Sequence, residues 1–422
     1  MSAAATAACG FVAWGAMGSF DLCMVGGDGF GFFDCALDPL ESSTLSVVLL
    51  IGLFLALLSA GYLILAIYRV LRYRAAPTVD VGFRPAVTIL KPLCGSEPEL
   101  YSCLRSFCDQ DYPEFQIVFG VADAADGAVT VVERLISEFP ALDLVLTIDP
   151  SIRGENLKVS NLVNMARFAK HNVITVSDSD TRVDRDCLAR VVAPLADART
   201  GAVTCLYKAA PMPGLASRLA ALFIDDWFLS SAVVDARMRE VTYCFGPVSA
   251  VRRDVLEAIG GFPRLASHLA DDFMMGRLIA AAGYRVELAD VIVETVVAET
   301  WRTLFAHELR WARTVKAVKP GEHFMSGITE PLPLIALLLF NHGALGWSAI
   351  GALVTLRLVL HYAMRVRFAV SPPCPWLVPL RECLCFGVWV ASFAGSSVRW
   401  RNRDFAIDAG GRLIPLASRY AS

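Results

Sequence analysis

The first 68 residues of this 422-residue chain contain no lysine or arginine, and the first basic residue is Arg69. Residues 45–68 carry no charge of either sign, and a helix of this length crosses a hydrocarbon layer of about 30 Å with some tilt. Arg72 and Arg74 follow closely after Arg69. Because basic residues are retained on the cytoplasmic side, we expect a non-cytoplasmic extension over 1–44 and a transmembrane helix over 45–68. A cleaved signal peptide is not expected, since the basic start is missing and the apolar run is too long.

Charged residues are also scarce, at 19% of the chain against 55% hydrophobic residues, and the mean hydropathy is +0.52. These values exclude an ordinary soluble protein, while the middle of the chain is too polar for a protein embedded throughout in lipid. We therefore expect one globular domain, residues 77–320, on the cytoplasmic side of a membrane. No nucleic-acid partner is expected.

The 12 cysteines include no CxxC pair with matching histidine spacing, which argues against a zinc site. Cys9, Cys23 and Cys35 precede the first apolar run, so two of them could pair in an oxidising compartment. The favoured interpretation of 1–44 is a disordered extension without an assigned function. The other nine cysteines are expected to be reduced, buried thiols.

A second apolar region, residues 328–400, predicts a return to the membrane before a tail at 401–422. Residues 331–356 hold no charge, and Asn341-His342-Gly343 in their middle could form a turn. The region is therefore one long tilted helix, or two segments of which one is short or re-entrant, followed by a further apolar run at 383–398. Arg357 and Arg381 are expected to snorkel to the interface.

Between the two apolar regions, strand-like and helical patterns alternate. The strand-like runs are 86–90, 115–122, 142–148 and 173–176, and the helical ones are 97–108, 128–138 and 158–169. This alternation predicts an α/β fold with parallel strands. Asp123 follows the second strand and Asp178-Ser179-Asp180 the fourth, at the strand ends where such sheets bind ligands. An isolated Asp-x-Asp is often only a turn, but at a strand end it favours Mg²⁺ or Mn²⁺ holding a nucleoside diphosphate.

Three further features each have two interpretations. Lys158 stands at a predicted helix start, where a cation is disfavoured unless it meets an anion such as a phosphate. Asp271-Asp272 open another helix, as ordinary first-turn acids or as a general base for an acceptor hydroxyl. Residues 215–234 are apolar apart from Asp225 and Asp226, and predict either a helix in the headgroup plane or a buried core helix.

Taken in order, these motifs resemble the membrane-bound ceramide glucosyltransferases, family 21, and their bacterial relatives associated with hopanoid sugar attachment. The resemblance covers about residues 86–319. Its matching stretches are Leu90-Lys91-Pro92-Leu93 with Gly95, Val121-Ala122-Asp123 to Asp126, Lys158 with Asn161-Leu162, the stretch from Ser177 to Val183, Ala270-Asp271-Asp272-Phe273, and Arg310-Trp311.

The resemblance implies a GT-A nucleotide-sugar-binding domain, with a mostly parallel sheet flanked by helices, between N- and C-terminal transmembrane helices. It implies a UDP-sugar donor, Mg²⁺ or Mn²⁺, and a lipid acceptor, hopanoid or ceramide. By analogy Asp123 contacts the uridine, Asp178 and Asp180 hold the ribose and the metal diphosphate, and Asp272 is the catalytic base. Arg310-Trp311 would form a membrane-proximal loop that closes on the diphosphate and acceptor. His307 stands where the family usually has Gln or Arg.

Local strings around 203–208, 223–229 and 307–314 look closer to the hopanoid-associated branch. The expected activity is an inverting transfer of N-acetylglucosamine to a bacteriohopanepolyol, by a multi-pass protein of the bacterial inner membrane. Glucose transfer to ceramide is the alternative. A processive polysaccharide synthase would need more membrane helices than the two to four expected here. A non-catalytic sugar-nucleotide-binding subunit would need the metal site but not Asp272.

Overall fold

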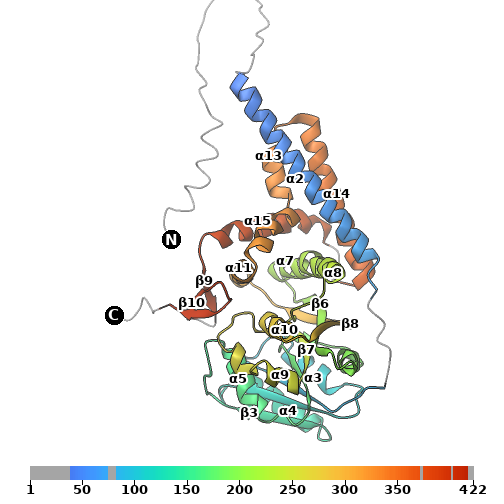
Figure 1. The fold of residues 1–422 in the computed structure, drawn as a ribbon, viewed down its shortest axis with the longest axis vertical. Helices are drawn as coiled ribbons and strands as arrows, with labels where there is room; N and C mark the ends of the chain where they lie inside the picture. Colours follow the sequence, from blue (N-terminus) through green and yellow to red (C-terminus); the bar gives the residue numbers. More distant parts are fainter. Residues whose placement is uncertain (1–38, 75–81, 371–373, 401–402, 417–422) are drawn as a thin grey trace, which may run out of the picture. The chain divides into compact units, whose positions relative to one another are not determined.

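The computed structural model describes residues 39–74, 82–370, 374–400 and 403–416 (Figure 1). The chain divides into two units, residues 1–46 and residues 47–422, and the second unit contains all of the described strands. The expectations for Cys9, Cys23 and Cys35 lie outside the described residues.

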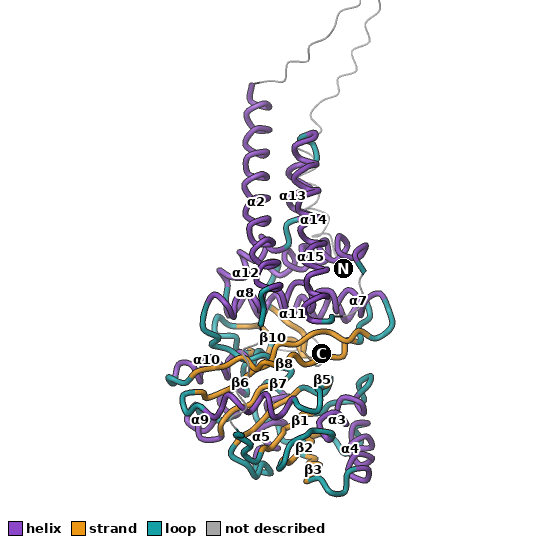
Figure 2. Tube along the Cα trace, turned by 90° about the vertical axis from the view of Figure 1, so that its right-hand side faces the viewer, coloured by secondary structure: helices purple, strands orange, loops and turns teal. Residues whose placement is uncertain are grey.

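The central element is an eight-stranded mixed sheet with strand order β3-β2-β1-β4-β7-β6-β8-β5 (Figure 2). β1 to β4 pair in parallel, β7 is antiparallel to β4 and β6, and β6 and β8 are parallel. The predicted α/β class is therefore confirmed. The strands are β1 (Val87–Pro92), β2 (Phe115–Val121), β3 (Asp143–Ile148), β4 (Val173–Ser177), β5 (Thr181–Arg182), β6 (Thr200–Pro211), β7 (Val248–Arg252) and β8 (Arg285–Val297).

Both faces of the parallel half of the sheet are covered, which explains why its strands are continuous apolar runs. In β2, Ile117 and Phe119 pack in the core shared with α3 and α4, whereas Val118 packs in the core shared with α5 on the other face. The helices of this half are α3 (Leu100–Cys108), α4 (Gly127–Glu138) and α5 (Leu157–Ala166), whereas α6 (Cys187–Val192), α9 (Arg253–Ala258) and α10 (Asp271–Ala281) contact strands β6, β7 or β8.

A helical layer lies against β6. It consists of α7 (Leu215–Leu222), a π-helical turn (Phe223–Phe228) and α8 (Leu229–Met238), in contact with α11 (Trp301–Val318) and α15 (Val378–Phe393). Most of the side chains from Ala216 to Val234 are buried in this layer. The structure thus favours the buried-helix interpretation of 215–234 over a helix lying in the headgroup plane.

Among the residues that the structure describes, three helical stretches are long and apolar enough to cross a membrane: Ser46–Leu71, Gly343–Phe368 and Pro375–Phe393. The first lies within α2 (Pro39–Leu71), the second is α14, and the third contains α15. A turn at residues 340–342 separates α14 from the eight-residue α13 (Leu332–Leu339), so this region forms two segments, one of them short. α13 rises only about 12 Å, which is too short to span. Figure 1 shows α15 lying across the lower end of α13, beside α11.

Snorkelling is wrong for both arginines. Arg357 and Arg381 are fully buried, and their guanidinium groups meet Glu382 at 2.6 Å and Glu308 at 2.6 Å, respectively. Snorkelling requires a side chain that faces lipid, whereas these two point into the contact between the helices, where a charge needs a partner.

The C-terminal segment also differs from the expected tail. A three-stranded antiparallel meander follows α15, with strands β9 (Ser397–Trp400), β10 (Arg403–Ile407) and β11 (Leu413–Pro415). It packs against the loop that precedes α10.

Candidate active site

The end of β4 delivers residues 178–180, and a buried lysine from the neighbouring strand fixes their backbone. Lys91 Nζ donates to Ser177 Oγ at 3.0 Å and to the Asp178 carbonyl oxygen at 2.7 Å, and lies 3.6 Å from the centre of the Phe107 ring. Burial lowers the pKa of Lys91 to about 7. On the other side, Val296 N–H donates to the Asp180 carbonyl oxygen at 2.9 Å. The turn is therefore held from both β1 and the segment at the end of β8.

Lys158, in the first turn of α5, joins two acidic groups that are far apart in sequence. Its Nζ lies 2.6 Å from Asp178 Oδ1 and 3.6 Å from Asp271 Oδ2. Burial alone would lower the pKa of Lys158, but Asp178, Asp271 and Asp272 more than offset burial and raise it. Lys158 is therefore a permanent cation. The anions beside it are carboxylates of the chain itself, and its contact with a phosphate stays a prediction.

Asp271 and Asp272 begin α10 directly opposite residue 178. A Cβ atom at Gly246 would lie 2.9 Å from Asp178 Oδ2 and 3.2 Å from Asp272 Oδ2, so both carboxylates approach the same glycine. Asp272 Oδ1 accepts a hydrogen bond from the Phe273 N–H at 2.8 Å. Burial, and next the charge of Asp271, raise the pKa of Asp272 to about 7. Asp272 can therefore gain and lose a proton near neutral pH.

Asn156 fixes this acidic pair relative to α5. It caps the helix by accepting from Val159 N–H at 3.0 Å, and its Nδ2 donates to Asp271 Oδ1 at 3.2 Å and to the His268 carbonyl oxygen at 2.8 Å. One side chain thus connects the start of α5, the loop before α10 and Asp271.

Asp180 is the second carboxylate of the turn, and it carries a buried Oδ1 atom without a hydrogen-bond partner. Burial, then the charges of Asp178 and Glu97, raise its pKa to about 7. An additional cation would relieve this repulsion. Within the described residues no group of three or more His, Cys, Asp or Glu side chains forms a complete metal cage. Asp180 therefore fits Mg²⁺ or Mn²⁺ of the kind held by one or two carboxylates together with substrate phosphates.

Asp123 lies in an exposed turn after β2. Its Oδ1 accepts from Ala125 N–H at 2.9 Å, while the nearby Asp126 caps α4 and accepts from Gly95 N–H at 2.8 Å. Gly95 has φ +80°, which favours glycine at this position. The loops after β1 and β2 are thereby tied together, and Asp123 is open to a ligand. Its described contacts are with its own turn, and its uridine contact stays a prediction.

The last motif lies on a helix, which corrects the expected loop. His307, Arg310 and Trp311 belong to α11, whose start is fixed by a reciprocal capping box of Thr300 and Thr303. His307 Nδ1 lies 2.9 Å from Glu299 Oε1, and its ring contacts that of Trp311 with centroids 4.4 Å apart. Trp311 in turn packs on Phe223, at 6.0 Å between centroids. Unlike Lys158, Asp178 and Asp272, this group is held mainly by the helical layer.

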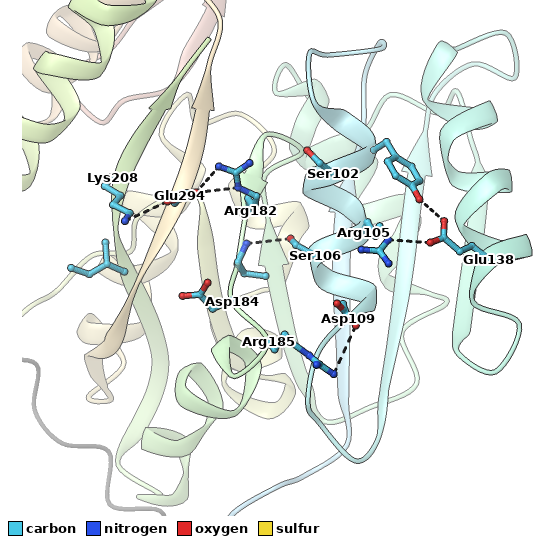
Figure 3. Close-up of a pocket in the computed structure, with 13 residues that line it drawn as sticks. Ser102, Arg105, Ser106, Asp109, Glu138, Arg182, Asp184, Arg185, Lys208 and Glu294 are labelled. Atoms are coloured by element: carbon cyan, nitrogen blue, oxygen red, sulfur yellow. Dashed lines mark hydrogen bonds and ion pairs between the residues drawn. The ribbon is translucent and has the colours of Figure 1, made fainter. Parts of the chain in front are cut away.

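A separate cavity of about 750 Å³ opens between α3 and the β5–β8 edge of the sheet (Figure 3). Arg182 binds Glu294 at 2.7 Å, and Lys208 lies 3.4 Å from the same carboxylate. The lining combines basic and acidic side chains that neutralise one another, and the predicted site residues do not line it. The charged lining residues are Arg105, Asp109, Glu138, Arg182, Asp184, Arg185, Lys208 and Glu294.

Sequence reasoning gave no role to Lys91, Asn156 or Gly246. A lysine inside an otherwise apolar strand was the available signal for Lys91, because a buried cation requires partners. Gly246 carries no comparable signal, since its closeness to two carboxylates exists only in the folded chain.

Acidic side chains lie at the ends of the parallel strands and face a further aspartate at a helix start, in a fold of the GT-A type. The fold agrees with that of a mannosyltransferase from Pyrobaculum calidifontis solved with GDP-Man and Mn²⁺. That structure matches with a TM-score of 0.54 and 23% identity over 83% of this chain and 98% of its own.

The sequence profile of glycosyl transferase family 21 matches residues 51–413, and the chain belongs to this family. Ceramide glucosyltransferase 3 of Caenorhabditis elegans is 23% identical over 78% of this chain and 74% of its own length. An N-acetylglucosaminyltransferase of Rhizobium meliloti is 28% identical over 57% of this chain and 58% of its own. The chain is thus a glycosyltransferase, and its long apolar helices make it a membrane protein.

Proposed function

We propose that this protein transfers one sugar from a UDP-sugar to a hydroxyl group of a membrane lipid, with inversion at the anomeric carbon. The observation that carries the proposal is the approach of Asp178 and Asp272 to Gly246 from two elements, with Lys158 linking residue 178 to Asp271. A donor group held at the sheet edge would lie beside a base at the start of α10.

In this proposal Asp272 is the general base. The acceptor oxygen forms a bond to the anomeric carbon, the bond from that carbon to the β-phosphate oxygen breaks, and UDP leaves with the electron pair. The acceptor proton passes to the Asp272 carboxylate. A pKa of about 7 suits this role, because such a carboxylate is a stronger base than an ordinary aspartate and still ionises near neutral pH.

The remaining predicted residues would bind the donor and bring the lipid near it. Asp123 contacts the uridine, Asp178 the ribose, and Lys158 the phosphates. Asp180 would hold Mg²⁺ or Mn²⁺, which supplies charge neutralisation for the diphosphate. Arg310 and Trp311 would contribute from α11, with His307 oriented by Glu299.

For the substrates, we propose N-acetylglucosamine as the sugar and a bacteriohopanepolyol as the acceptor. The similarity to the rhizobial N-acetylglucosaminyltransferase supports the sugar. Glucose transfer to ceramide is the second candidate, supported by the longer match to the nematode ceramide glucosyltransferase. The proposed location is a bacterial inner membrane, with several membrane segments and the catalytic domain in the cytoplasm.

Mass spectrometry of products formed in lipid bilayers tests the proposal. The purified protein is given Mg²⁺ or Mn²⁺, with UDP-glucose or UDP-N-acetylglucosamine against ceramide or a polyhydroxylated hopanoid. A hexosamine on the hopanoid that is lost in Asp272→Asn but kept in Asp254→Asn supports the favoured substrates; Asp254 is an exposed matched control on α9. Hexosyl ceramide would establish the second candidate. No product from any pair, with UDP-sugar binding intact, would overturn the catalytic assignment.

A further inference from the structure

The C-terminal meander holds the loop that leads into Asp271 and Asp272. Leu269 N–H donates to the Gly411 carbonyl oxygen at 3.1 Å, and Leu413 N–H donates to the Ser267 carbonyl oxygen at 2.8 Å. Between these two bonds, His268 pairs antiparallel with Arg412. Residues 267–269 therefore pair with the edge of the meander as a short additional strand would, although the two segments are far apart in sequence.

Apolar packing reinforces the backbone pairing. Leu269 is buried in a small core with Phe405 and Leu413, which are 2% and 4% exposed. Val398 and Ile407 complete this core, and Ala317 of α11 packs on its edge. Burying this apolar area favours the docked meander, and the same area would face water if the meander detached.

The opposite side of the loop leads directly to the candidate active site. The His268 carbonyl oxygen accepts from Asn156 Nδ2, the same group that donates to Asp271 Oδ1. The Ala266 carbonyl oxygen accepts from Asn156 N–H at 2.8 Å. Residues 266–269 thus lie between the meander on one side and the start of α5 on the other, and have little regular structure of their own.

The meander is also connected closely to the last apolar helix. Only residues 394–396 separate α15 from β9, and α11 holds this connection. Lys316 Nζ donates to the Gly395 carbonyl oxygen at 2.7 Å, and Arg313 Nη1 donates to the Ser397 carbonyl oxygen at 2.5 Å. The chain of contacts therefore runs from α15 through the meander and residues 266–269 to Asp271.

We propose that the C-terminal meander is a positioning element for the transfer reaction, with Phe405 and Leu413 as its positioning residues. This inference rests on the proposed function. Docking of the meander sets where α10 begins, and so sets the distance of Asp272 from the donor-binding turn. The donor contacts at the ends of β2 and β4 do not involve the meander, and Lys158 is held more closely by Asp178 (2.6 Å) than by Asp271 (3.6 Å), so loss of the meander should impair transfer and spare UDP binding.

The test compares Leu413→Ala with Ile414→Ala in the full-length protein in bilayers, because Ile414 is the adjacent residue and is 49% exposed. We expect kcat to fall about tenfold or more in Leu413→Ala, with the Kd for UDP within twofold of wild type, and no change in Ile414→Ala. Hydrogen exchange should increase at residues 266–272 in Leu413→Ala but not within α5. If Leu413→Ala does not fold, Leu413→Val is used instead, because it removes less of the buried side chain.

Three outcomes would overturn the inference: kcat unchanged while exchange at 266–272 increases, exchange unchanged in Leu413→Ala, or UDP affinity falling in parallel with kcat. The last result would indicate a general loss of structure. Failure of the proposed function is distinguishable, because wild-type protein would then form no glycolipid with any donor and acceptor pair.

Discussion

At the scale of single residues, the site gathers several carboxylates around the partly buried ammonium group of Lys158. Asp178, Asp271 and Asp272 surround Lys158, and Asp180 carries a raised pKa of about 7 beside them. Burial of Asp272 and, next, repulsion from Asp271 cost folding free energy, and both also give Asp272 the basicity that a proton acceptor needs. Activity and stability should therefore respond in opposite directions when an acid is removed.

Asp272→Asn should lower the activity and raise the stability of the protein. Loss of a general base is expected to lower kcat by roughly 10²–10⁴-fold. The pKa of Asp272 lies near 7 in the folded protein and at 3.8 in its ordinary state, so the folded form binds the proton more tightly. Wild-type stability therefore falls as pH rises from about 4 to 7, and the asparagine variant escapes this loss. We expect its Tm to exceed that of wild type by several degrees at pH 8.

Thermal unfolding in bilayers between pH 4 and pH 8 measures the difference in Tm, which should shrink towards pH 4. Asp254→Asn is the control, because that side chain is 65% exposed and should leave Tm unchanged. A lower Tm for Asp272→Asn at pH 8 would show that the carboxylate stabilises the fold and would contradict the assigned environment.

The pH dependence of transfer should follow the same group. Because Asp272 must be deprotonated to act as a base, kcat/KM should rise with pH and pass its midpoint near pH 7. Lys158 lowers the pKa of Asp272, so Lys158→Met should move the midpoint to higher pH as well as weaken donor binding. Initial rates measured at fixed free Mg²⁺ between pH 5.5 and 9 provide the test. A midpoint that stays in place in Lys158→Met would show that this cation does not act on the base.

The sequence predicted the aspartates at the strand ends, because apolar runs and the acids that follow them are local patterns. The approach of Asp178 and Asp272 to Gly246 could not be predicted in this way, since it depends on how β4, α5 and α10 pack. The same applies to Lys91, whose partners at Ser177 and Asp178 lie on another strand.

At the scale of whole elements, a buried ion pair and a buried aspartate–histidine hydrogen bond join the catalytic domain to the C-terminal helices. Glu308 of α11 binds Arg381 of α15 through two hydrogen bonds of 2.7 and 2.6 Å. Asp226 in the π-helical turn meets His361 of α14 at 2.6 Å. A hydropathy pattern records the charge in an apolar helix but not the partner that lies in another part of the chain. Arg381 was therefore expected at the interface, while the fold buries it against Glu308.

Removing one member of such a pair should be far more harmful than removing both. Arg381→Leu leaves Glu308 buried without its cation, and we expect a loss of about 3–5 kcal/mol in the free energy of unfolding. The double variant Arg381→Leu/Glu308→Leu should recover most of it, because two apolar side chains replace the pair. Arg399→Leu is the control, since its pair with Asp404 is exposed and should contribute about 0–1 kcal/mol. Unfolding in bilayers measures all three, and equal losses in the single and double variants would contradict the prediction.

At the scale of the whole molecule, the docked meander constrains how the chain crosses the membrane. Residues 403–415 contact the loop before α10, so they must lie on the same side of the membrane as the catalytic domain. The chain between α11 and β9 must therefore return to the side from which it left, with α13 and α14 entering and leaving the membrane as a hairpin. Composition alone makes α15 a candidate span, yet it lies crosswise to α14, beside α11 of the catalytic domain (Figure 1). Hydropathy and length alone select α15 as a membrane-crossing helix, because neither quantity records the direction in which the helix runs.

The resulting topology can be tested with a membrane-impermeant maleimide in intact and permeabilised cells, read by peptide mass spectrometry. Thr44→Cys should be labelled in intact cells, because the absence of basic residues before Arg69 places it outside. Cys94 is exposed on the catalytic domain and should be labelled only after permeabilisation. Ile414→Cys in β11 should behave like Cys94, because the meander docks on the same domain. Labelling of Ile414→Cys in intact cells, with Cys94 protected, would mean that α15 crosses the membrane and that the meander does not reach the loop before Asp272.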